Sequence, residues 1–70
     1  MPDLSHVVFL LIIAYWAPQI SQPVEVQHAV FSSPDECGAE ALRRDAEWTK
    51  KVHGGSTSYA CFAAVPGPST

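Results

Sequence analysis

Residues 33–36 read Ser-Pro-Asp-Glu and residues 53–55 read His-Gly-Gly, and these two stretches decide where the chain is helical. Ser33 suits the N-cap, proline is favoured at the first helical position, and Glu36 completes a capping box. Glycine after the last turn can take the left-handed conformation that closes a helix. The sequence therefore predicts a helix over about residues 34–53.

Two stretches with strand character lie on either side of this helix. Residues 24–31 alternate with a period of two and contain several β-branched side chains, and residues 56–65 alternate in the same way. A long helix between two strands of similar length favours a β-α-β unit with parallel strands. We therefore expect an α+β or α/β fold built on a minimal strand-helix-strand unit.

The alternation also predicts which side chains face the helix. In the first strand the valines and His28 are expected to face it, and in the second strand Tyr59, Cys61 and Ala63 are. The other face then has nothing to cover it, and an uncovered apolar patch on a small protein usually marks an interaction site. The predicted interaction face, with the two phenylalanines as anchors, consists of Ala29, Phe31, Ala60, Phe62 and Ala64.

The chain has two cysteines, Cys37 in the first helical turn and Cys61 in the second strand. An even pair in an exported chain indicates a disulfide, which in the chain-entropy model contributes about 3 kcal/mol for a loop of this length. A less favoured alternative is thiol-redox chemistry at Cys37, because a helix N-terminus lowers the pKa of a thiol. The spacing differs from that of disulfide oxidoreductases, and no metal site, cofactor site or catalytic constellation is predicted.

The N-terminal part is apolar from Val7 to Ala17, an unbroken run of 11 residues. This length is typical of the apolar region of a signal peptide and is too short for an ordinary transmembrane helix. We expect residues 1–21 to be a signal peptide or hydrophobic membrane segment. A retained anchor over residues 4–20 is the alternative, and a buried element of a soluble protein is a third possibility.

Size and charge limit the function further. The 70 residues carry a net charge of −3, and all four Lys and Arg residues follow residue 24. So small a chain without a basic face does not predict a nucleic-acid binder or a large enzyme. We expect residues 22–65 to form a small disulfide-stapled domain and residues 66–70 to form a disordered tail.

The functional expectation is accordingly a small, non-catalytic, exported protein, periplasmic or secreted. It would bind an unknown protein partner or associate with itself, and it would touch a membrane only through its N-terminal segment. The alternative is a membrane-anchored protein that faces an oxidising compartment, with the apolar segment retained. No motif is specific enough to name a family.

Overall fold

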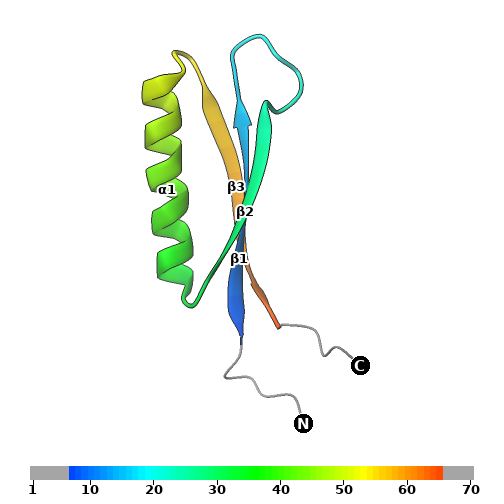
Figure 1. The fold of residues 1–70 in the computed structure, drawn as a ribbon, viewed down its shortest axis with the longest axis vertical. Helices are drawn as coiled ribbons and strands as arrows, with labels where there is room; N and C mark the ends of the chain where they lie inside the picture. Colours follow the sequence, from blue (N-terminus) through cyan, green and yellow to red (C-terminus); the bar gives the residue numbers. More distant parts are fainter. Residues whose placement is uncertain (1–6, 66–70) are drawn as a thin grey trace.

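The computed structural model describes residues 7–65, which form a sheet with one helix packed on it, an α+β fold. Figure 1 shows the helix along one face of the sheet, and no described element covers the other face. The predicted tail, residues 66–70, and residues 1–6 lie outside the described part of the chain. In chain order the elements are β1 (Val8–Trp16), β2 (Glu25–Phe31), α1 (Pro34–Lys51) and β3 (Ser56–Ala64).

The strand order is β2-β1-β3, and β1 pairs antiparallel with both neighbours. β2 and β3 therefore run in the same direction, but they do not pair with each other. The predicted strand-helix-strand unit with parallel strands is therefore present, but β1 lies between its two strands, which the sequence did not predict. The physical reason is that β1, the most apolar segment, occupies the central position, where both of its backbone edges are hydrogen-bonded and its side chains are best shielded from water.

The N-terminal apolar run thus forms the central strand. Leu11 lies opposite Ala29 on one side and opposite Cys61 on the other, so segments 1–21 and 22–65 contribute to the same sheet. Among the three possibilities raised by the sequence, this placement corresponds to the buried element. Cleavage and membrane targeting are not visible in a folded chain, and both stay predictions.

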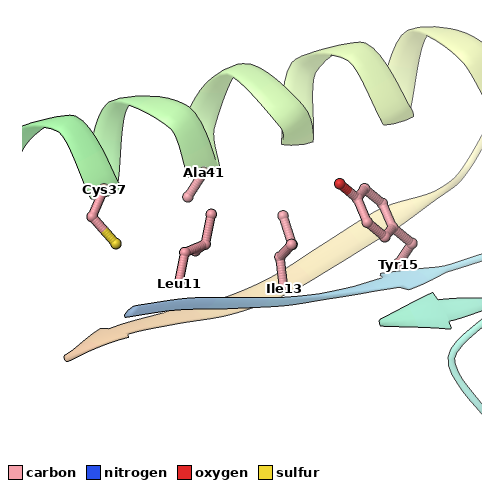
Figure 2. Packing of buried hydrophobic residues seen from close by; sticks show 5 residues of the cluster. All are labelled: Leu11, Ile13, Tyr15, Cys37 and Ala41. Carbon is pink, nitrogen blue, oxygen red and sulfur yellow. The ribbon is translucent and has the colours of Figure 1, made fainter. Parts of the chain in front are cut away.

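The core lies between α1 and the central strand (Figure 2). Leu11 and Ile13 are completely buried, Tyr15 is 7% exposed, and all three point from β1 toward the helix. Cys37 and Ala41 point back from the helix and are also fully buried. A helix with small residues on its inner face can approach a sheet closely, so the larger side chains of β1 fill the space between the layers.

The helix begins where the sequence indicates. The Ser33 hydroxyl accepts a hydrogen bond of 3.1 Å from the backbone N–H of Glu36, as in an N-cap. The helix ends at Lys51, two residues before the expected His53, because Val52 is already extended. Gly54 has a φ of +81° and makes the left-handed turn into β3.

The side chains of β2 face the opposite way from the prediction. Ala29 and Phe31 lie on the helix side of the sheet, and His28 and the neighbouring valines lie on the uncovered side. The prediction assigned the more apolar face of β2 to the core. In the structure β1 supplies most of the core. The helix side of β2 therefore lies at the rim of the core, where the polar residues Glu25 and Gln27 are tolerated.

Candidate functional site

The face of the sheet opposite α1 is apolar and accessible, and it is the candidate site. Its side chains come from alternate residues of the three strands, and we call it the uncovered face. Leu10 of β1 lies between Val30 of β2 and Phe62 of β3, which makes a continuous apolar row across the sheet. Val30 is 58% exposed and Phe62 is 44% exposed. Further side chains of this face are Ile12, Ala14, Val26, His28, Ala60 and Ala64.

The chemistry of this face is that of hydrophobic contact. The strand residues that form it include no Asp, Glu, Lys or Arg, and His28 is its titratable side chain. At one end the indole N–H of Trp16 donates a hydrogen bond of 3.0 Å to the Ser58 hydroxyl. An uncharged surface of this kind can bind another apolar surface by excluding water.

The structure places three of the five predicted interface residues on this face, namely Ala60, Phe62 and Ala64. Ala29 and Phe31 lie on the helix side, where Phe31 packs against the core, so their assignment to the uncovered face was wrong. Four large residues of the face were not predicted: two lie in the N-terminal run, which was interpreted as one apolar block, and two are valines of β2 that were assigned to the helix side. Alternation within residues 8–16 could have revealed two of them. The missed residues are Leu10, Ile12, Val26 and Val30.

The predicted disulfide is confirmed. Cys37 and Cys61 are bonded, with their Cα atoms 6.2 Å apart, and the described chain contains no free cysteine. The bond joins the first turns of α1 to the middle of β3, so it fixes the helix over the side of the sheet that it covers. Both sulfur atoms are used in this bond, which leaves no thiolate at Cys37 in the disulfide form.

A cleft of about 450 Å³ opens between the second half of α1 and the β2 side of the sheet. The Tyr15 hydroxyl donates a hydrogen bond of 2.9 Å to Oε1 of Gln27, and the Arg44 guanidinium donates one of 3.2 Å to the same oxygen. Gln27 in turn donates to the Glu25 carboxylate at 2.9 Å. These groups bond to one another, and together they close the β2 side of the core.

An ion-pair cluster on the helix borders this cleft. Arg43 and then Arg44 donate hydrogen bonds to Glu40, and these bonds lower the pKa of the Glu40 carboxyl to about 2. The same contact raises the pKa of Arg44. Arg43 also bonds Glu47, one turn further along the exposed side of the helix. Ion pairs at these spacings stabilise a helix. Here they also place charged groups beside β2, at that edge of the sheet.

Within residues 7–65 no three His, Cys, Asp or Glu side chains gather closely enough to hold a metal ion. In the same part of the chain, no helix has both the length and the apolar character needed to cross a membrane. No protein-family model matches the chain, and no curated protein and no solved structure matches it significantly.

Proposed function

We propose that the protein is a small, non-catalytic binding protein of an oxidising compartment and that the uncovered face is its binding surface. The observation that carries the proposal is a contiguous apolar sheet face on a scaffold held by a disulfide. Contiguous apolar patches on soluble proteins mark interaction sites. The partner is a protein with a complementary apolar surface, because the face offers shape and apolar area and no charge.

The disulfide supports the proposed compartment. Disulfides form and persist in oxidising environments and are rare in the cytosol of most organisms. The apolar N-terminal run supports export in addition, since its length matches that of an export signal. The proposal therefore keeps the exported location, periplasmic or secreted.

We further propose that the apolar run is retained after export and acts as β1. Leu11, Ile13 and Tyr15 belong to this run and make up most of the buried core. β2 and β3 each pair with β1, so a chain cleaved after residue 21 would keep two strands that do not touch. Such a chain would lose most of its buried apolar area, which is the main stabilising contribution to a small domain.

Export is tested with a reporter that is active only outside the cytoplasm, fused to residues 1–23. We expect activity, and Leu11→Arg should abolish it, because an arginine in mid-segment costs about 2.5–3.5 kcal/mol on the insertion scale. The intact mass of the exported protein distinguishes retention from cleavage. A loss of the first ~21 residues would contradict retention, and recovery in the membrane fraction would favour an anchor.

Binding is tested by placing a photo-crosslinking residue at Phe62 in the exported full-length chain. A matched probe at Ala46, which is exposed on the outer side of the helix, serves as the control. We expect adducts with a discrete partner at Phe62 and none at Ala46. Equal labelling at the two positions would contradict a binding role for the uncovered face.

A further inference from the structure

The two edges of the sheet are protected to different degrees. β3 pairs only with β1 within the described residues, so its outer edge presents unpaired backbone groups. Charged residues and proline usually prevent edge strands from pairing with other strands. Residues 56–64 contain neither, and they contain no glycine. β2 carries Glu25, and the ion-pair cluster around Glu40 lies beside it. The β3 edge is therefore the one open to strand addition.

The side of α1 above this edge is uncovered and, except for Asp45, apolar in its middle part. The Thr57 hydroxyl donates a hydrogen bond of 2.6 Å to Asp45, so the side of the helix that carries Asp45 faces β3. Leu42 and Gly38 precede Asp45 by three and seven residues and therefore lie on the same side. Leu42 is 60% exposed, and a Cβ added at Gly38 would meet no atom within 4 Å.

Tyr59 extends this apolar side onto the sheet. On β3 it lies between Thr57, bonded to Asp45, and Cys61, bonded to Cys37, so it is level with the middle of the helix. Its side chain is 45% exposed. We call the outer edge of β3, together with Gly38, Leu42 and Tyr59, the β3 flank.

We propose that a second copy of this chain docks on the β3 flank about a twofold axis. The two β3 strands pair antiparallel, which extends the sheet to six strands and places both helices on the same side. The inference goes beyond the proposed function, because it uses the β3 flank, whereas the proposed binding surface is the uncovered face.

Symmetry and charge favour a second copy over an unrelated partner. The bonds Cys37–Cys61 and Asp45–Thr57 set the middle of α1 level with Tyr59, one residue from the middle of β3, so a single twofold axis near Tyr59 passes close to the middle of both elements. The helices of the two copies then run antiparallel. The acidic first turn of one, with Asp35 and Glu36, lies toward the basic last turn of the other, with Lys50 and Lys51. The paired strands themselves bring no like charges together.

The available area is sufficient for a dimer. Nine strand residues extend about 30 Å, and the sheet and helix layers together are about 20 Å deep, which gives roughly 600 Å² per copy. The total of about 1,200 Å² lies at the lower end of stable protein interfaces. With sheet spacing of about 4.8 Å, the helix axes lie on the order of 10–14 Å apart, a gap that leucine and tyrosine side chains can fill.

Sedimentation velocity of the full-length, oxidised chain from about 1 to 300 µM tests the dimer. We expect a species of twice the 7.6 kDa chain mass at the upper concentrations. Leu42→Glu and Tyr59→Lys should each raise the dissociation constant by about tenfold or more, because each places charge at the axis. Val26→Glu is the matched control, since Val26 is 57% exposed on the uncovered face. It should leave the dissociation constant within about twofold.

A monomer throughout this range would overturn the proposal. A dimer that Val26→Glu weakens as much as Leu42→Glu does would overturn its location and would assign the contact to the uncovered face. Circular dichroism establishes that each variant is folded, and Tyr59→Lys keeps the test decisive if Leu42→Glu does not fold. Phe62 lies on β3, so a Phe62 adduct of twice the chain mass reports the second copy, whereas an adduct of another mass reports the partner of the uncovered face. The dimer and the proposed function can therefore fail separately.

Discussion

The two faces of β1 are almost equally apolar, yet only one of them is buried. Leu11, Ile13 and Tyr15 face the helix and are shielded from water, whereas Ile12, between them in sequence, is 39% exposed on the other face. The strand's own composition therefore does not determine which face becomes the core. The helix and its disulfide to β3 decide it, because they can cover only one side of the sheet.

The sharpest way to test this comparison is a pair of isoleucine substitutions on β1. Ile13→Ala should lower the free energy of unfolding by about 2–5 kcal/mol, because it removes buried methyl groups and leaves a cavity. Ile12→Ala should lower it by only about 1 kcal/mol, because Ile12 already contacts water. Urea unfolding followed by circular dichroism measures both. Equal losses would mean that the two faces are equally buried, for example by association in solution.

The second prediction concerns the disulfide that holds the helix to the covered face. Replacing both cysteines with alanine should lower the free energy of unfolding by about 3 kcal/mol in the chain-entropy model. Reduction of the unmodified protein is the matched control, and it should lower the urea midpoint by a similar amount. A double variant as stable as the oxidised protein would show that packing alone holds the helix in place.

Sequence patterns were informative where the signal was local. The capping residues Ser33 and Glu36 located the start of the helix, and the face of β3 followed from simple alternation. The pairing of Cys37 with Cys61 followed from their number and from their placement on facing elements.

The rest of the fold depends on long-range pairing that local patterns do not contain. An apolar run such as residues 7–17 fits an export signal and a central strand equally well, since both need apolar side chains. The face of β2 depends on which side of the sheet receives the helix, and Phe31 reaches the core only because β1 fixes the register. Two of the five predicted interface residues were misplaced for this reason.

A third, smaller effect is expected at the start of the helix, on which the difference between the two faces depends. Ser33→Ala removes the acceptor for the Glu36 N–H and should lower the free energy of unfolding by about 1 kcal/mol. Ser33→Gly should lower the free energy of unfolding by only a few tenths of a kcal/mol, since glycine is tolerated at the N-cap. Thermal unfolding of the two variants checks the order, and a more stable alanine variant would contradict a capping role.

The smallest effect is the pH dependence of stability that arises from the ion-pair cluster around Glu40, on the helix side of the sheet. The pKa of Glu40 is lowered from 4.5 to about 2, so its ion pairs stabilise the fold above pH 4.5, and this contribution is lost as the pH falls toward 2. The side chain lies near the surface, and solvent screening limits the effect to less than about 1 kcal/mol. Glu40→Gln should therefore flatten the dependence of the urea midpoint on pH between about 2 and 4.5.

Added salt should flatten this dependence in the unmodified protein as well, because salt screens exposed ion pairs. If the unmodified protein and Glu40→Gln lose stability equally over this range, the acid sensitivity arises at other carboxylates. The ion-pair cluster would then contribute nothing to holding the helix on the sheet.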